Sequence, residues 1–494
     1  MKRGNTFFLF LITCGIILRL MFMMSTGFTN DEGAYLYDAK WIASGQLTKG
    51  DALTKTPISV FIFGLSVLLT KQSLYAARMV SILASILTLF PLVIICRELR
   101  LNKYVVSFVW ILFAGAVTFQ ILGQTETLSS LFAAFMFAFF LKSLNARTKW
   151  NGWITGLFFG LAFATRKSNA ILLFFLIAGL CIAAIAKEKK YKLIKDYILG
   201  FMTVIIPLSF MISVFYGWNG IKEFIGIGYG NIVIKTINGT ENIWNFNFVD
   251  SLKALTRIAS SFIVIYLFSL IYGISLIFQE GKRIFRNKFF LPLLWIISLT
   301  FFYAVSPIFL VDYAADFLLP LTLLAGMIFE EIKANSSRML KVVVTIIIVL
   351  NVFNYYSLWK KPWTGMFEAS AIRESARELL KTIPSKEPIL TAAAIVPYYS
   401  GHHIYEDVSH PLWYRYSFVD KKTLEAYLPS KETVVNEIKS GKTKWLLLDH
   451  LTDYAYFRGK ENLIDLVSKN WELVTVIENE TGFRSNPLTV YKRK

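Results

Sequence analysis

Two adjacent carboxylates, Asp31 and Glu32, lie in the segment GFTNDEGAYLYDAKWIASGQL, directly after the first long apolar stretch of the chain. A carboxylate held at a membrane border can act as a general base or can orient a hydroxyl group. Tyr35 and Trp41 follow the acidic pair in an amphipathic pattern. Alternatively, these aromatic residues only form part of an interfacial belt at the membrane–water boundary. The segment therefore predicts an acidic site at the edge of a membrane.

Further ionisable residues stand at the ends of apolar blocks, and we expect them at the same membrane face: Lys55, Glu126, Arg166, Lys167, Asp312 and Asp316. Ionisable groups at membrane depth are costly, so they usually line a cavity and have a partner. The alternative is that they only flank helix ends and extend to water, and for Lys55 alone that alternative is at least as good. The set as a whole predicts an outward cavity that combines carboxylates with cations.

The composition places this chain among membrane proteins. Of 494 residues, 55% are hydrophobic and only 17% are charged, whereas about a quarter of the residues of a soluble domain are charged. The apolar residues fall into blocks that approach ~20 residues, the length that a helix needs to cross a bilayer. We expect a polytopic α-helical membrane protein with about 11 transmembrane helices.

The net charge of +19 follows from topology and does not indicate a nucleic-acid partner. Lys and Arg gather in the short hydrophilic gaps 97–103, 142–149, 187–195 and 282–288. Short loops rich in Lys and Arg stay on the cytoplasmic side. This rule predicts a cytoplasmic N-terminus and a multi-pass protein of the cell membrane. The N-terminal apolar segment lacks a small-x-small cleavage site and exceeds the usual signal length of ~7–15 residues, which predicts an uncleaved first span.

The same rule divides the chain into two domains. Residues 1–358 are expected to form the transmembrane domain, with an external first loop at 27–74 and a further external loop at 217–256. Within it, we expect the third span over about 104–122. The apolar stretch 57–70 is too short to cross, and we expect it to lie along the outer interface or to re-enter.

Residues 359–494 are expected to form a small extracytoplasmic α/β domain. Helical patterns such as AIRESARELLKTI alternate there with short apolar runs such as KWLLLDH, which favours a partly parallel sheet. The stretch WELVTVIE and the terminal SNPLTVYKRK predict a closing pair of strands. The segment GHHIYEDVSH suggests the hypothesis of a metal site at His402, His403, Asp407 and His410. Their spacing matches no established ligand pattern, so histidines that serve packing or lie at the surface are favoured.

The first loop and its flanks resemble the GT-C glycosyltransferases that use lipid-linked sugars. The likeness is greatest to the protein O-mannosyltransferases and the aminoarabinose transferases that modify lipid A (glycosyltransferase family 39-like). In those families an Arg in the first span is followed by an external Asp-Glu, with a Tyr three residues after the Glu. Arg19, Asp31, Glu32 and Tyr35 fit this pattern.

The likeness continues through KTPISVFIFGLSVLL, YAARMVSILASILT, GLFFGLAFATRKSNAIL and DFLLPLTLLAG, and it covers about 7–335. Three positions depart from the family pattern. Asp316-Phe317 replaces a Tyr or His-Tyr before the late Leu-Pro, one extra residue separates Lys55 from Pro57, and Glu126 stands where relatives commonly have Asp. These departures bear on the substrate more than on the class of reaction.

The resemblance implies a reaction and a set of roles. A sugar would pass from a polyprenyl-phosphate donor, such as a dolichyl phosphate, to an acceptor hydroxyl at the outer face, with inversion. The sugar would be a hexosyl group such as mannosyl, or a pentosyl group. The implied catalytic residues are Asp31, Glu32 and Glu126, and the implied donor phosphate ligands are Lys55, Arg166 and Lys167. Substrate contacts would come from Tyr35, Trp41, Asp312 and Asp316.

The resemblance also implies partners. The acceptor would be a lipid, a glycan or a protein, membrane lipids would surround the chain, and no nucleic acid is involved. Glu126 would hold the acceptor, a neighbouring Arg or Lys, or a metal, so a divalent metal ion is a further candidate cofactor. The main alternative function is a transporter or flippase of lipid-linked saccharides, which would also have a polar cavity and broken helices.

Overall fold

The computed structural model describes residues 2–46, 56–145, 149–173, 176–177, 192–225, 260–280, 290–305, 311–335, 337–360, 367–384, 387–409, 431–449, 452, 467, 469–477 and 487–494. Lys55 and His410, and most of the predicted external loop 217–256, lie outside these residues. The backbone of Asp312 lies in a short 3-10 helix, η3 (Val311–Ala314).

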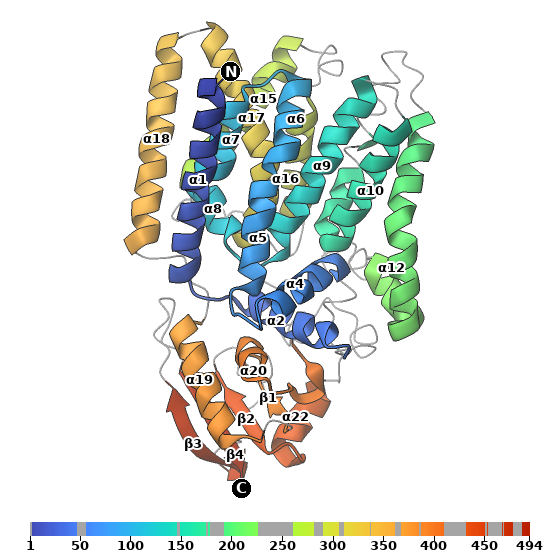
Figure 1. The fold of residues 1–494 in the computed structure, drawn as a ribbon, viewed down its shortest axis with the longest axis vertical. Coiled ribbons are helices and arrows are strands. Elements are labelled where there is room, and N and C mark those ends of the chain that lie inside the picture. Colours follow the sequence, from blue (N-terminus) through green and yellow to red (C-terminus); the bar gives the residue numbers. More distant parts are fainter. Residues whose placement is uncertain are drawn as a thin grey trace.

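Most of the chain forms a bundle of roughly parallel and antiparallel helices (Figure 1). Its members are α1 (Lys2–Ser25), α5 (Ala76–Leu87), α6 (Leu89–Leu99), α7 (Lys103–Leu112), α8 (Ala114–Gln120), α9 (Thr125–Asn145), α10 (Lys149–Thr165), α12 (Lys192–Ile225), α15 (Ser260–Glu280), α16 (Phe290–Val305), α17 (Ala315–Asn335) and α18 (Ser337–Lys360). The N-terminus lies at one end of the bundle and the C-terminal domain at the other. The predicted multi-pass helical membrane fold is confirmed.

Helix length and apolar character identify the clearest membrane spans. Of the described helices, four are long and apolar enough to cross a membrane, or five if α7 and α8 form one bent span. Shorter apolar helices accompany them, at Pro57–Leu69, Ile263–Ser275, Phe290–Ala304 and Thr345–Trp359. The number of about 11 spans stays a prediction.

Two helices of the first loop lie between the bundle and the C-terminal domain (Figure 1). Helix α2 (Asn30–Ala43) begins with a capping box, in which Thr29 and Glu32 each bind the other's backbone amide. Such reciprocal bonds satisfy amides that a helix start leaves free. Helix α4 (Pro57–Leu69) has Pro57 in its first turn, where the missing amide hydrogen costs nothing. The predicted external loop therefore consists largely of helices.

The segment predicted as the third span, about 104–122, consists of two helices with a break between them. Helices α7 and α8 meet at an angle of 57°, because Phe113 between them has extended backbone angles. A helix end inside a membrane leaves carbonyl and amide groups that must find partners within the protein. The buried guanidinium of Arg19 is the partner of two of these carbonyls, since it donates to Ile111 at 2.8 Å and to Trp110 at 3.2 Å.

Helix α18 seals the other half of the break. The Asn351 side chain donates to the Leu112 carbonyl at 3.0 Å and accepts from the Ala114 amide at 2.7 Å. The Tyr355 hydroxyl also donates to the Leu112 carbonyl, at 3.0 Å. Side chains from α1 and α18, the first and last helices of the bundle in sequence, therefore satisfy the interrupted backbone. This explains why the helix can break there.

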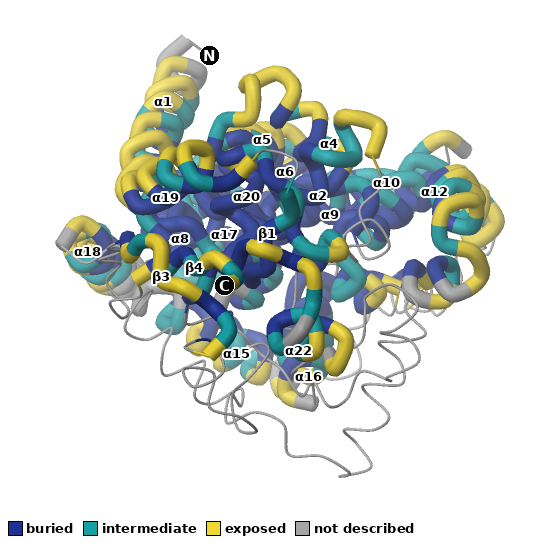
Figure 2. The backbone as a smooth tube through the Cα atoms, turned by 90° about the horizontal axis from the view of Figure 1, so that it is seen from below, coloured by how far each residue is buried: buried dark blue, intermediate teal, exposed yellow. Residues whose placement is uncertain are grey.

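The C-terminal domain contains a four-stranded sheet of order β1-β2-β4-β3. Its elements are α19 (Ala369–Thr382), β1 (Ile389–Leu390), α20 (Ile395–Ser400), α22 (Lys431–Ser440), β2 (Trp445–Leu448), β3 (Trp471–Ile477) and β4 (Leu488–Arg493). Strands β1 and β2 are parallel and the other pairs are antiparallel. The expected closing strands correspond to β3 and β4. Seen from the domain end, buried segments gather in the middle of the view, around α20, β1 and α2 (Figure 2).

We expect the Asn351→Leu variant to be destabilised, because it leaves the Leu112 carbonyl short of a partner and the Ala114 amide unpaired. An unsatisfied buried polar group costs about 1–3 kcal/mol. Thermal unfolding in detergent, compared with the Val352→Ala variant at the exposed neighbouring position, measures the difference. Equal melting temperatures for the two variants would contradict this account of the break.

Candidate functional site

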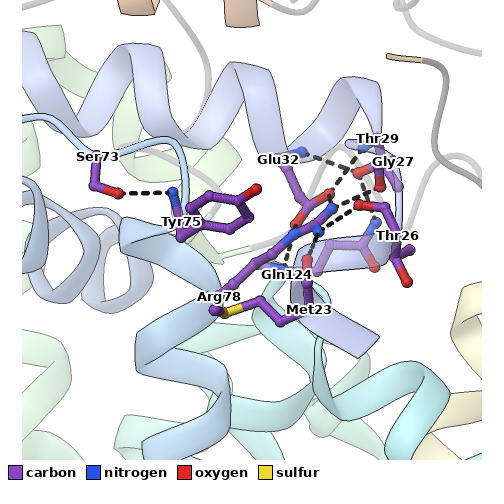
Figure 3. Close-up of polar contacts among 10 residues, drawn as sticks. Met23, Thr26, Gly27, Thr29, Glu32, Ser73, Tyr75, Arg78 and Gln124 are labelled. Atoms are coloured by element: carbon purple, nitrogen blue, oxygen red, sulfur yellow. Dashed lines mark hydrogen bonds and ion pairs between the residues drawn. The ribbon is translucent and has the colours of Figure 1, made fainter. Parts of the chain in front are cut away.

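Glu32 lies at the centre of a buried network, in which both of its carboxylate oxygens are bound (Figure 3). Oε1 accepts from Arg78 Nε and from the Gly123 amide, each at 2.7 Å. Oε2 accepts from the Thr29 amide at 2.8 Å and from Arg78 Nη2 at 2.9 Å. These four bonds occupy the acceptor positions that a carboxylate offers. Such a carboxylate suits a positioning role better than a direct chemical one.

Arg78, on α5, completes the network from the other side (Figure 3). Its Nη1 donates to the carbonyls of Met23 and Thr26, both at 2.8 Å, and its Nη2 donates to the Gly27 carbonyl at 2.6 Å. The guanidinium also lies over the Phe28 ring at 3.9 Å. Arg78 thereby ties the end of α1 to the start of α2. The sequence places this arginine in the stretch YAARMVSILASILT, but its type and spacing alone did not predict that it belongs to the site.

Asp31 and Tyr35 share a face of α2 that differs from that of Glu32. They lie four residues apart, which places them one above the other on a helix, and both are half-buried. Because Glu32 is fixed by Arg78 and Gly123, the orientation of its neighbour Asp31 is fixed with it. The Tyr35 ring lies 6.1 Å from that of Phe63 on α4. The first turn of α2 thus presents a half-buried carboxylate beside an aromatic ring.

A second cluster surrounds Arg166, which follows α10. Its Nη1 lies 2.5 Å from Glu126 Oε1, and its Nε lies 3.2 Å from the carboxylate of Asp316 at the start of α17. Asp316 also accepts hydrogen bonds from the Ser168 hydroxyl at 3.1 Å and from the Tyr303 hydroxyl. The sequence left three partners open for Glu126: the acceptor, a metal, or a neighbouring Arg or Lys. In the structure Glu126 pairs with an arginine. Lys167, next in sequence, is half-buried.

The turn before α9 connects the two clusters. Gln124 donates to the Thr29 hydroxyl at 3.3 Å, and Gly123 binds Glu32. Two residues further on, Thr125 and Glu126 reach Arg166. The start of α4 joins them, since the Ser59 hydroxyl donates to the Thr165 carbonyl at 3.3 Å. The structure thus brings the predicted residues Asp31, Glu32, Tyr35, Glu126, Arg166, Lys167 and Asp316 to one end of the bundle.

Trp41 has a different neighbourhood from Asp31. Its ring stacks on that of His403 in the C-terminal domain, with the centroids 3.9 Å apart. One face of the indole is therefore occupied by protein. The stacked pair joins α2 to the domain and leaves less of Trp41 for a substrate than the sequence suggested.

The histidines of the C-terminal domain serve packing in the described part of the chain. His402 is buried, and its ring nitrogens pair with the Ser400 hydroxyl at 2.9 Å and the Ile383 carbonyl at 3.2 Å. Burial lowers the pKa of His402 below its usual value, which favours a neutral ring. Among the described residues, no group of three His, Cys, Asp or Glu side chains could hold a metal ion.

We expect the Arg78→Ala variant to lose much of its stability, because it leaves the Glu32 carboxylate buried without its cation. Breaking a buried pair by removing one partner costs ~3–5 kcal/mol. Thermal unfolding in detergent tests this against Met79→Ala, which truncates the adjacent and exposed side chain. An Arg78→Ala protein that melts with the Met79→Ala control would refute the anchoring role.

Residues 54–214 match the family model described as dolichyl-phosphate-mannose-protein mannosyltransferase. The structure resembles that of ArnT from Cupriavidus metallidurans bound to undecaprenyl phosphate, with a TM-score of 0.61, 12% sequence identity and 98% of both chains covered. The apo form of the same ArnT gives a TM-score of 0.63 at 11% identity, covering 99% of this chain and 98% of that chain.

The oligosaccharyltransferase of Archaeoglobus fulgidus, in complex with Zn and sulfate, is also similar. It has a TM-score of 0.56 and 10% identity, and the likeness covers 96% of this chain and 72% of that chain. None of the curated protein sequences matches this chain. Likeness at these identities concerns the fold, and it agrees with the matched family segment. The fold is therefore similar to that of ArnT and of the oligosaccharyltransferase, in agreement with the resemblance of the first loop to the GT-C glycosyltransferases.

Proposed function

We propose that this protein transfers a sugar from a polyprenyl-phosphate donor to an acceptor hydroxyl, with inversion, at the membrane face that carries α2. The observation that carries this proposal is the position of Asp31. A buried network holds it at the end of the bundle, connected to the ion-pair cluster around Arg166. The family model of a dolichyl-phosphate-mannose transferase and the undecaprenyl phosphate bound by ArnT support a lipid-phosphate donor.

Asp31 is the general base in this proposal. Its carboxylate takes the proton of the acceptor hydroxyl as the hydroxyl oxygen attacks the anomeric carbon. The bond between that carbon and the phosphate oxygen breaks, and polyprenyl phosphate leaves with the bonding electrons. Such proton transfer typically contributes about 10²–10⁴-fold to a rate. Tyr35 lies on the same helix face and would contact the sugar or the prenyl chain.

We propose that Lys167 and Lys55 bind the donor phosphate. Cations stabilise a leaving phosphate as its negative charge develops. The charge of Arg166 is balanced by Glu126 and Asp316, so we assign Arg166 chiefly to holding Lys167 in place. We also propose that Asp312 and Asp316 lie near the substrate. Asp316 accepts a hydrogen bond from Ser168, the residue after Lys167.

The orientation of the protein follows from the basic loops. Lys and Arg near the N-terminal end of the bundle favour the cytoplasm there. The C-terminal domain lies at the opposite end (Figure 1), so we place it and the α2 face outside the cell membrane. The sugar would be a hexose or pentose, and the acceptor would be a lipid, glycan or protein.

Transport of a lipid-linked saccharide is the competing function, and the broken pair α7–α8 is the feature that favours it. Broken helices in transporters present free backbone groups to the substrate. Here Arg19, Asn351 and Tyr355 bind the free carbonyls. A break that is sealed by side chains offers little to a transported substrate, so we prefer transfer.

We expect Asp31→Asn to abolish transfer while the protein remains folded, because an amide keeps the shape of the carboxylate but cannot accept the proton. The measurement is the rate of sugar transfer from a polyprenyl-phosphate donor, alongside the melting temperature. Glu374→Gln, an exposed acid on α19, is the matched control and should keep wild-type activity. Wild-type turnover in Asp31→Asn would remove Asp31 from the mechanism.

For Lys167→Ala we expect donor binding to weaken by tens-fold or more. Truncating one partner of a desolvated charge pair costs about 2–5 kcal/mol. Binding of a polyprenyl-phosphate sugar to the detergent-solubilised protein measures the effect. Lys195→Ala, an exposed lysine on α12, serves as control. Equal donor affinity in both variants would show that Lys167 is an ordinary residue at a helix end.

A further inference from the structure

One face of α2 is used by the C-terminal domain. Gly33, Tyr37, Lys40 and Trp41 recur at the spacing of a single helix face, and each of them meets the domain. The closest approach is at Gly33, where an added Cβ would lie 2.8 Å from the Ile395 amide nitrogen and 2.9 Å from its Cβ. Only glycine permits this approach, so the backbones of α2 and α20 are in direct contact.

The Tyr37 hydroxyl is the most specific of these contacts. It donates to Asp407 Oδ1 at 2.8 Å and accepts from the Ile404 amide at 2.8 Å. Burial and the nearby Asp407 carboxylate raise the pKa of Tyr37 above its usual value, so the hydroxyl keeps the proton that it donates. One atom of α2 therefore satisfies two groups of the domain.

The loop that receives Tyr37 has an unfavourable backbone conformation. Glu406 and Asp407 have φ angles of 52° and 54°, in the left-handed region that residues other than glycine seldom adopt. Such conformations persist only where the surroundings enforce them, and they cluster at functional sites. The bond from Tyr37 to Asp407 is one of the contacts that enforce this one.

Further bonds flank Tyr37 along the same helix. Lys40 Nζ donates to the Tyr398 carbonyl at 3.0 Å, and the Ser409 hydroxyl donates to Asp38 Oδ2 at 3.0 Å. Lys40 is buried in this contact, and burial lowers its pKa to about 8. The stack of Trp41 on His403 extends the contact to the end of the helix.

The opposite side of α2 packs on α4, where a Cβ added at Gly64 would lie 3.1 Å from the Ala39 carbonyl. The domain also reaches past α2. Phe28 and Phe367 exchange backbone hydrogen bonds of 2.7 and 3.2 Å, and the Tyr398 hydroxyl donates to the Ser73 carbonyl at 2.9 Å. Helix α2 is thus held between the bundle and the domain.

We propose that the C-terminal domain is a clamp that acts together with the Glu32–Arg78 pair to set the orientation of α2 and so aims the Asp31 carboxylate, with Tyr37 as the main positioning residue on the domain side. This inference rests on the proposed function, because it assigns the domain a part in transfer. Asp31 lies in the first turn of the clamped helix. A misplacement of about 1 Å at a reacting group can cost about 10²-fold in rate.

The test compares Tyr37→Phe with Tyr399→Phe, which removes a hydroxyl from the exposed neighbour of Tyr398 on α20. For Tyr37→Phe we expect kcat of sugar transfer to fall about tenfold or more, with an unchanged KM for the donor. Hydrogen–deuterium exchange of the amides in 30–37 should accelerate, while the bundle helices keep their protection. Tyr399→Phe should change neither quantity. Ser409→Ala, altered on the domain side, should act in the same direction as Tyr37→Phe.

The outcomes separate the clamp from the proposed function. With an active wild-type protein, a wild-type kcat in both Tyr37→Phe and Ser409→Ala would overturn the clamp, and so would a change confined to donor KM. If the wild-type protein transfers no sugar from any polyprenyl-phosphate donor, the proposed function fails instead. The exchange experiment needs no activity, and unchanged exchange over 30–37 in both variants would by itself overturn the clamp.

Discussion

Taking a carboxylate and a guanidinium out of water is costly, and the buried Glu32–Arg78 pair persists because all of its hydrogen-bonding groups have partners. The five N–H groups of Arg78 are divided between Glu32 and three carbonyls, of Met23, Thr26 and Gly27. The remaining acceptor positions of Glu32 take the amides of Thr29 and Gly123. Through this pair, α1, α2, α5 and the turn before α9 meet at one point, and the position of Asp31 depends on it.

Helix α2 connects the Glu32–Arg78 pair to the candidate site. Its first turn is bound to the bundle through Glu32, while its other faces pack on α4 and on the C-terminal domain. The carboxylate of Asp31 stays half-buried, which agrees with the base role that we propose for it. The same turn that binds Glu32 leads into Glu126, so the acidic centre and the Arg166 cluster share one scaffold.

The sequence alone predicted the membrane fold and the gathering of ionisable residues, because apolar block length and Lys/Arg distribution are local signals. It even included a basic neighbour among the roles for Glu126. It did not predict contacts made across the fold. Arg78 pairs with Glu32 over 46 positions, and Asn351 binds the Ala114 amide over 237 positions. Local patterns cannot foresee the break at Phe113 or the stacking of His403 on Trp41, because helix packing creates both.

The most direct test of transfer against transport uses the purified protein in sealed vesicles with a polyprenyl-phosphate sugar and an acceptor alcohol. Released polyprenyl phosphate and movement of the intact donor between leaflets are measured in the same sample. Our account predicts release of polyprenyl phosphate, with the transferred sugar in the inverted anomeric configuration and no protein-dependent movement of the intact donor. Movement of the intact donor without released polyprenyl phosphate would contradict the account and identify the protein as a flippase.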